Sequence, residues 1–222
     1  MKRYVSAAVI ALLAATSVVA QAPKGWRVRA DRSTSASDPD AAGSIKFVTM
    51  GTGFHAINPQ AAVYWNPANT ATGSYTLKGT FTLMKPSDHT NYYGLVFGGS
   101  DLEGPNQNYL YFVVAQDGTW LVKRRDGNVA TQNVATGPSP AVKKLDATGK
   151  SVNALEVRVT PKGTEYLVNG TTVYTAPRTG PAAKTDGRGL QRVWVLIFGL
   201  GLCSDHGRGV ATSPLTGPNP SR

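Results

Sequence analysis

The chain has 222 residues, 41% of them hydrophobic, and a formal net charge of +10 at pH 7. That length is enough for one domain with a core of its own, and too short for several domains of ordinary size. The only cysteine is Cys203, which excludes an intramolecular disulfide, so that packing must hold the fold together.

The N-terminus has the three-part layout of a secretory signal peptide. Lys2 and Arg3 give a positive start, an uncharged apolar stretch follows, and small residues precede the expected cleavage site. We expect residues 1–20 to be removed, so that the mature chain begins at Gln21; cleavage after Ala22 is the alternative. A membrane anchor fits less well, because the apolar stretch is shorter than the roughly 20 residues that span a bilayer. The protein is therefore expected to be exported, to the periplasm or the extracellular space.

Composition divides the mature chain into three parts. Residues 21–43 form a polar leader, which either pairs as a first strand or lies loosely on the surface. Regular patterning runs over residues 44–203, the expected domain, and ends in the apolar run 192–203, which is too short to cross a membrane and is expected to be a buried final strand. Residues 204–222 are rich in Gly, Pro, Ser and Thr and are expected to be disordered.

Short β-prone runs separated by turn residues predict an all-β fold. The run 75–84 alternates apolar and polar side chains, as does 154–159, and a period of two is typical of half-buried strands. Asp117-Gly118 and Asn169-Gly170 each separate two such runs, which predicts type I′ hairpins. After the N-terminal segment, no stretch shows a sustained helical period. The sequence thus predicts an antiparallel sandwich of two sheets.

The central hairpin provides the candidate ligand-binding residues. A two-residue loop at Asp117-Gly118 pairs Ala115 with Trp120, and so places two different sets of side chains on the two faces. The first set is predicted to be core and consists of Leu110, Phe112, Val114 and Leu121, with Lys123 and Arg125 near the strand ends. The second set consists of Tyr109, Tyr111, Val113, Trp120, Val122 and Arg124. Aromatic rings pack on the apolar faces of sugars, and Arg is a rigid fork of donors. Tyr109, Tyr111, Trp120 and Arg124 are the predicted ligand-binding residues; aromatic side chains that merely favour strands are the alternative.

Four segments also carry a family resemblance. The segments YYGLVFGGSD (92–101), NYLYFVVAQDGTWLVKRR (108–125), NALEVRV (153–159) and EYLVNGTTVY (165–174) resemble the laminin-G-like, concanavalin A-like lectin and glucanase superfamily. The resemblance covers Ile45 to Leu190 and looks closest to bacterial 3-keto-disaccharide hydrolase-type domains. It implies a jelly-roll of two sheets, one of which often faces carbohydrate. It does not bring an activity with it, because this fold hosts lectins, glycosidases and plain interaction modules.

The chain has no evident catalytic constellation. Glycoside hydrolysis needs two carboxyl groups across the scissile bond, and Glu156 and Glu165 stand singly on neighbouring strands. Asp101 and Glu103 lie two residues apart in one loop. They are the best available carboxylate pair, and with Asn106 and Asn108 they are a possible Ca²⁺ site, although an ordinary polar loop is the simplest interpretation. No catalytic residue is assigned, no cofactor is expected, and the separation of His55, His89 and His206 argues against zinc.

The positive charge is spread along the chain rather than gathered in one patch. Together with export, this argues against nucleic acid and for a carbohydrate or an anionic envelope polysaccharide as the partner, with plain solubility as the alternative explanation of the charge. We therefore expect a carbohydrate-binding sandwich without a catalytic centre. A hydrolase acting on glycosides, including 3-keto saccharides, and a protein-interaction module of the cell envelope remain alternatives.

Overall fold

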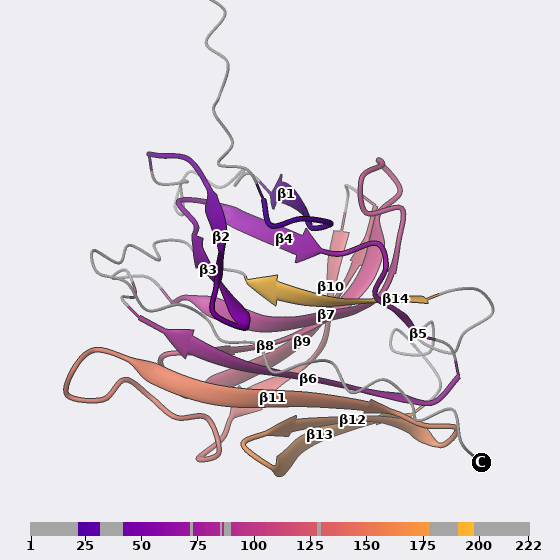
Figure 1. Cartoon of the computed structure of the whole chain (residues 1–222). Helices are drawn as coiled ribbons and strands as arrows, with labels where there is room; N and C mark the ends of the chain where they lie inside the picture. The colour runs from indigo at the N-terminus through magenta and orange to yellow at the C-terminus, as the bar shows by residue number, and fades with distance from the viewer. Residues whose placement is uncertain are drawn as a thin grey trace, which may run out of the picture.

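A computed structural model describes residues 22–31, 42–71, 73–84, 86, 90–127, 130–177 and 191–197, with the backbone alone at 130, 131 and 191–197. Over these ranges the chain forms β-strands and no helix. Two antiparallel sheets pack face to face (Figure 1). The predicted all-β sandwich is therefore confirmed. Within these ranges no helix is long and apolar enough to cross a membrane.

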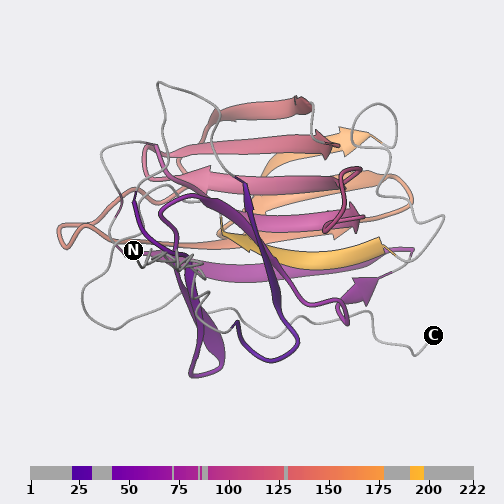
Figure 2. The same ribbon diagram turned by 90° about the horizontal axis from the view of Figure 1, so that it is seen from above.

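The larger sheet has the strand order β1-β4-β14-β7-β8-β9-β10. Its strands are β1 (Arg27–Asp31), β4 (Ala61–Trp65), β14 (Gln191–Ile197), β7 (Tyr92–Ser100), β8 (Asn108–Ala115), β9 (Thr119–Asp126) and β10 (Ala130–Pro138). The short β5 (Thr70–Ala71) pairs with β14. Figure 2 shows strands of this sheet side by side, with the orange strands of the smaller sheet behind them.

The smaller sheet has the order β13-β12-β11-β6. Its strands are β13 (Thr171–Pro177), β12 (Gly163–Val168), β11 (Ser151–Val159) and β6 (Tyr75–Leu83). The chain passes from the larger to the smaller sheet between β5 and β6 and between β10 and β11, and back between β6 and β7 and between β13 and β14. These crossings produce the two-sheet jelly-roll. A separate hairpin, β2 (Lys46–Met50) and β3 (Gly53–Ile57), projects at one side (Figure 1).

Two segments resolve expectations that the sequence left open. The polar leader contributes β1, which pairs with β4 from Arg27 to Asp31, so this part of the leader is an edge strand of the larger sheet. The predicted final strand corresponds to β14, which lies between β4 and β7 in that sheet. Residues 198–203 and the predicted signal peptide and tail lie outside the described residues.

The main core fills the space between the two sheets. It is built from large side chains without solvent exposure, among them Phe81, Leu95, Phe112 and Val157. The sheets approach closely at Gly94, where an added Cβ would lie 2.2 Å from the carbonyl oxygen of Phe112 and 2.8 Å from a methyl group of Leu155. Glycine is therefore required at this position by packing rather than by its backbone angle.

The hairpin between β8 and β9 differs from its predicted pairing by one residue. Its loop has three residues, and Val114 rather than Ala115 lies opposite Trp120. Among the three loop residues, only Gly118 has a positive φ, of 94°. The Asp117 carboxylate accepts hydrogen bonds from the Thr119 amide and hydroxyl at 2.9 and 2.6 Å. This is the three-residue loop that ends in a left-handed glycine, instead of a type I′ turn.

That one-residue change reverses every side chain of β9, because strand side chains alternate between faces. Trp120, Val122 and Arg124 therefore lie on the core side, with Leu110 and Phe112. The predicted division of the hairpin faces is therefore confirmed for β8 and wrong for β9. Leu121, predicted to be core with Leu110, instead packs with Tyr109 and Tyr111 on the other face of the sheet.

Candidate binding site on the concave face of the large sheet

The outer face of the larger sheet carries a second buried cluster, here called the concave-face cluster. Its members are Val63, Trp65, Val96, Leu102, Tyr109, Tyr111, Val113 and Leu121. They come from β4, β7, β8, β9 and the loop between β7 and β8. Side chains on the outer face of a sheet are normally exposed, so their burial shows that this face is covered or strongly curved.

Curvature follows from one contact between distant strands. The Tyr109 hydroxyl on β8 donates to the Asp31 carboxylate on β1 over 3.2 Å. Four strand-to-strand steps separate β1 from β8 in the sheet, which in a flat sheet is roughly 19 Å. Two side chains of this size cannot span that distance, so the sheet must bend toward its outer face, which is therefore concave.

Strand β1 supplies three polar side chains at alternate positions. Arg27 forms an ion pair with Glu103, and Arg29 donates to the carbonyl oxygens of Leu102 and Gly104 at 3.2 and 3.4 Å. Asp31 accepts from Tyr109. The period of two along the strand places all three on one face. Each of them therefore contacts the β7–β8 loop or β8 across the concave face.

The β7–β8 loop is shaped by its own residues. Asp101 has a positive φ of 48°, and its carboxylate accepts a hydrogen bond from the Asn106 amide at 3.0 Å. The Gly104 amide donates to the Asp101 carbonyl at 3.1 Å, and a Cβ at Gly104 would lie 2.1 Å from the Asp101 carboxylate. The loop is thereby folded tightly around Asp101, which presents Glu103 toward β1.

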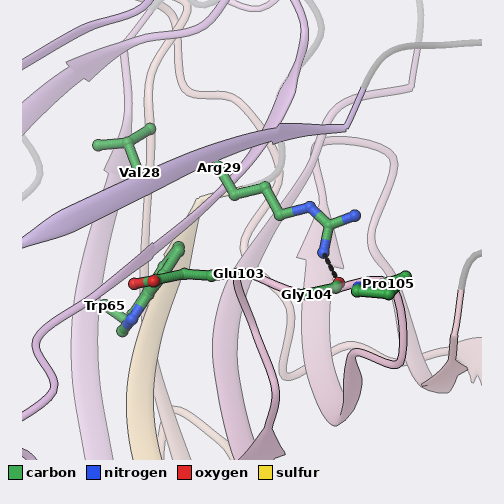
Figure 3. Close-up of a pocket in the computed structure, with 6 residues that line it drawn as sticks. All are labelled: Val28, Arg29, Trp65, Glu103, Gly104 and Pro105. Carbon is green, nitrogen blue, oxygen red and sulfur yellow. Dashed lines mark hydrogen bonds between the residues drawn. The ribbon is translucent and has the colours of Figure 1, made fainter.

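Two adjoining pockets open beside this loop. One, of about 440 Å³, is lined by Val28, Arg29, Trp65, Glu103, Gly104 and Pro105, which Figure 3 shows. The other, of about 530 Å³, is lined by Arg27, Trp65, Pro67 and residues 99–103. Trp65 and Glu103 line both pockets and so form the wall between them. An indole surrounded by guanidinium and carboxylate groups can accept an amphipathic ligand, with apolar contact to the ring and hydrogen bonds at the rim.

The two tyrosines of the cluster stay protonated over the ordinary pH range. Burial raises the pKa of Tyr109, and the negative charge of Asp31 raises it further against the opposing effect of Arg125. Burial likewise raises the pKa of Tyr111, and Arg125 again opposes the shift. Both phenols are therefore neutral hydrogen-bonding groups, and their rings lie 5.8 Å apart.

The structure divides the four predicted ligand-binding residues between two faces. Tyr109 and Tyr111 belong to the concave-face cluster, together with Trp65. Trp120 and Arg124 lie on the core side of the same sheet. The expectation that these four side chains form one surface is wrong for the reason given above, the shifted hairpin register. Their direct role in ligand binding stays a prediction.

Trp120 and Arg124 both interact with other side chains of the protein. The Trp120 ring stacks on Tyr174 of the smaller sheet, with centroids 5.6 Å apart and planes at 22°. The Arg124 guanidinium pairs with Asp126 at 3.0 Å, while its buried Nε has no hydrogen-bond partner. Both side chains are more than nine-tenths buried. Because Trp120 lies between the two sheets, packing explains why a large aromatic side chain is present there.

The carboxylates considered from the sequence fall into two groups. Glu156 and Glu165 lie on the smaller sheet and pair with Arg158 at 2.6 and 3.5 Å. Burial alone would raise the pKa of Glu156, but hydrogen bonds from Arg158 and Lys78 outweigh it, and the pKa is lowered. Asp101 and Glu103 remain together in the β7–β8 loop and both line the second pocket.

Several residues that the sequence suggested as metal ligands can be located in the structure. In the part of the chain that the structure describes, no three His, Cys, Asp or Glu side chains converge on a metal-binding cluster. Asn108, considered as a calcium ligand, donates to Asp126 at 3.1 Å. Burial lowers the pKa of His55, which favours its neutral form. His89, His206 and Cys203 lie outside the described residues. A Ca²⁺ ion at the β7–β8 loop stays a prediction.

Sequence reasoning missed Arg27, Arg29 and Trp65. The alternation Arg-Val-Arg-Ala-Asp over 27–31 was an available signal, because it places two cations and an acid on one face of a strand. Trp65 ends a short apolar run, which by itself marks a core strand as readily as a binding surface. What the sequence could not provide was the curvature that brings β1 over the β7–β8 loop.

The fold has known counterparts among solved structures. The carbohydrate-binding module CBM66 from Bacillus subtilis matches with a TM-score of 0.50 at 11% identity, covering 78% of this chain and 89% of the module. Sheep galectin-11 matches at 0.40 and 16% identity, covering 58% and 88%, and the Bacillus licheniformis β-glucanase at 0.39 and 12%, covering 81% and 82%. Neither the family models nor the curated protein sequences gave a match. At 11% identity the likeness to this module shows the fold alone, a jelly-roll sandwich of two sheets.

Proposed function

We propose that the protein binds carbohydrate on the concave face of its larger sheet. The observation that carries the proposal is the pair of pockets that share the Trp65 indole and are rimmed by Arg27, Arg29 and Glu103. Sugar rings present apolar C–H faces to an aromatic ring and hydroxyls to the rim, and this site offers partners for both. The likeness in fold to a carbohydrate-binding module supports carbohydrate as the class of ligand.

The experiment is a binding screen of the exported chain against soluble polysaccharides, both neutral and uronic, by affinity electrophoresis followed by calorimetry. We expect Trp65→Leu to weaken binding of any retained glycan at least tenfold, because it removes the aromatic surface common to both pockets. Tyr174→Leu is the matched control, since this half-buried aromatic side chain lies on the smaller sheet. Equal affinity in the wild type and the Trp65 variant would reject this site.

Cleavage of the bound glycan is a second candidate function. It is favoured by Asp101 and Glu103, whose side chains line one pocket together, and by the sequence resemblance to 3-keto-disaccharide hydrolase-type domains. An acid and a base across a scissile bond would be required. Released sugar, assayed in the same samples, tests it: Asp101→Asn with Glu103→Gln should abolish any release. Release that survives the double substitution excludes this pair.

Export is the setting in which we propose that this binding occurs. The positive start and apolar stretch of residues 1–20 support a signal peptide, and the partner would then be a glycan of the cell envelope or its surroundings. N-terminal sequencing of the protein recovered from the cell envelope and the medium tests this. A mature chain that starts at Gln21 agrees with the proposal, whereas a chain that retains Lys2 and Arg3 contradicts it.

A further inference from the structure

The indole at the candidate site is covered even though two pockets reach it. Trp65 lines both pockets, yet only 2% of its surface is exposed. A ring that accepts a sugar face must present that face to solvent. Glu103 lines the same two pockets and overlaps the Trp65 ring in the view of Figure 3, while the concave-face cluster packs against the rest of the indole. Glu103 is thus the charged side chain that lies beside the indole in both pockets.

The partner of Glu103 is the guanidinium of Arg27. Both side chains are about half exposed, at 57% and 54%, so solvent screens their ion pair and makes it weak. The backbone around Glu103 is held separately, because Arg29 donates to the carbonyls of Leu102 and Gly104 on either side. The Glu103 side chain can therefore rotate away without rearrangement of the loop.

Three other charged groups of this face, Arg29, Asp31 and Arg125, already have partners. Arg29 is held by the two loop carbonyls and lies 3.7 Å from Asp31, which in turn accepts from Tyr109. Arg125 donates to the Gly127 carbonyl at 2.8 Å. Arg27 differs from them, because its partner is the exposed side chain of Glu103. Its guanidinium is the group at which a ligand can replace a protein partner.

We propose that Glu103 is an internal competitor, and that the site takes saccharides that carry a carboxylate, such as uronic acids. This inference rests on the proposed carbohydrate binding. The ligand carboxylate takes the place of Glu103 on Arg27, where the planar guanidinium matches a carboxylate with two parallel hydrogen bonds. Glu103 rotates outward, more of the Trp65 indole becomes accessible to the sugar ring, and the part of the wall between the two pockets that Glu103 forms is removed.

The test compares oligosaccharides of galacturonic, glucuronic and mannuronic acid with their methyl esters, which keep the sugar and remove the charge. The wild type is expected to bind at least one free acid more tightly than its ester, with a preference that weakens as salt is added. Glu103→Gln should raise the acid-to-ester preference about threefold to tenfold, because it removes both the competitor and a repelling charge. Arg27→Gln should lower affinity for the acid about tenfold and abolish the preference.

A second ion pair supplies matched controls. Arg158 and Glu165 on the smaller sheet are also exposed and 3.5 Å apart, so Glu165→Gln and Arg158→Gln make the same charge changes away from the site. Neither should alter the acid-to-ester preference. Glu103→Ala is a second variant that removes the side chain as well as its charge. It should strengthen binding of the ester too, since no side chain at position 103 then has to be displaced from the pockets.

Three results would overturn the inference. A Glu103→Gln variant, folded like the wild type, whose preference is unchanged or reduced would show that Glu103 does not compete. Wild-type protein that binds neutral saccharides but never prefers an acid to its ester would reject the uronic-acid class and leave carbohydrate binding intact. Binding to no saccharide, free or esterified, in the wild type and the Glu103 variants would reject both proposals.

Discussion

The hydroxyl of Tyr109 on β8 donates to the carboxylate of Asp31 on β1, and this bond joins two strands that are four pairing steps apart. It links the curvature of the larger sheet to the position of the leader strand. Arg29 and Arg27 precede Asp31 at alternate positions of the same strand. The contact between Tyr109 and Asp31 therefore helps to place both arginines over the β7–β8 loop.

Removal of this hydroxyl should loosen β1. We expect Tyr109→Phe to lower the free energy of unfolding by about 1 kcal/mol, because Asp31 loses a hydrogen bond in a largely buried position. Hydrogen exchange of the β1 amides should become faster in the same variant, since β1 is an edge strand of five residues. Chemical denaturation and hydrogen exchange measure the two effects.

Tyr92→Phe is the control for that prediction. Tyr92 is half-buried on β7, and its hydroxyl lies 3.5 Å from the Thr119 hydroxyl, the outer limit of a hydrogen bond. We expect its effect on stability to be smaller and exchange at β1 to be unaltered. Unchanged exchange of β1 in Tyr109→Phe would show that the contact does not hold the leader strand.

Alkaline pH should unfold the protein cooperatively. Burial raises the pKa of six tyrosines, namely Tyr64, Tyr75, Tyr93, Tyr109, Tyr111 and Tyr166. In the unfolded chain these phenols lose their protons near pH 10, whereas in the folded chain they keep them. Above roughly pH 10 the unfolded state therefore binds fewer protons, and each such tyrosine lowers stability by about 1.4 kcal/mol per pH unit.

Tyrosinate absorbance and near-UV circular dichroism, followed together against pH, check this expectation. Below about pH 10 the tyrosines are protonated in both states and folding stability is at its full value; above that pH stability is lost. Tyrosinate absorbance and circular dichroism should therefore change together in one steep transition. Tyr166→Phe should move that transition to higher pH, if the variant is as stable as the wild type at neutral pH. A gradual tyrosinate signal with unchanged circular dichroism would contradict the burial of these phenols.

Alternation along single strands was enough to predict the fold class. Strand β6 buries every second residue from Tyr75 to Leu83, as the apolar-polar pattern indicated. Asn169-Gly170 forms the predicted type I′ hairpin, with positive φ at both residues and Val168 opposite Thr171. The side chain of Asn169 also donates to the Ala141 carbonyl at 2.8 Å. Patterns that involve only neighbouring residues are visible in the sequence.

The candidate site depended on information of longer range. Asp-Gly predicts a two-residue turn, but the Asp117 carboxylate binds the Thr119 amide and thereby favours the three-residue loop. One residue of register then decided the face on which Trp120 and Arg124 lie. The position of Arg27 beside Glu103 depends on sheet curvature, which arises from packing among strands far apart in the chain. A single sequence records no such contact.

Gly94 should tolerate no larger side chain. A Cβ there would lie 2.2 Å from the Phe112 carbonyl oxygen, a distance that only backbone movement between β7 and β8 can relieve. We expect Gly94→Ala to lower the free energy of unfolding by about 3 kcal/mol, as overpacking against backbone does. Gly137→Ala is the control, since its Cβ would meet the Trp120 ring at an ordinary 3.5 Å. Equal stability of the two variants in urea would contradict the close approach.

A substitution at Trp120 can distinguish two roles: ligand binding, which the sequence predicted, and packing, which the structure indicates. Trp120→Phe removes part of a ring that stacks on Tyr174 between the sheets, and should lower the free energy of unfolding by about 2 kcal/mol. Because this side chain lies on the face opposite the pockets, we expect glycan affinity to change much less than in Trp65→Leu. Denaturation and calorimetry on the same samples measure both quantities. A folded Trp120→Phe variant that loses affinity tenfold would return this residue to the binding surface, because a packing role between the sheets explains lost stability but not lost binding.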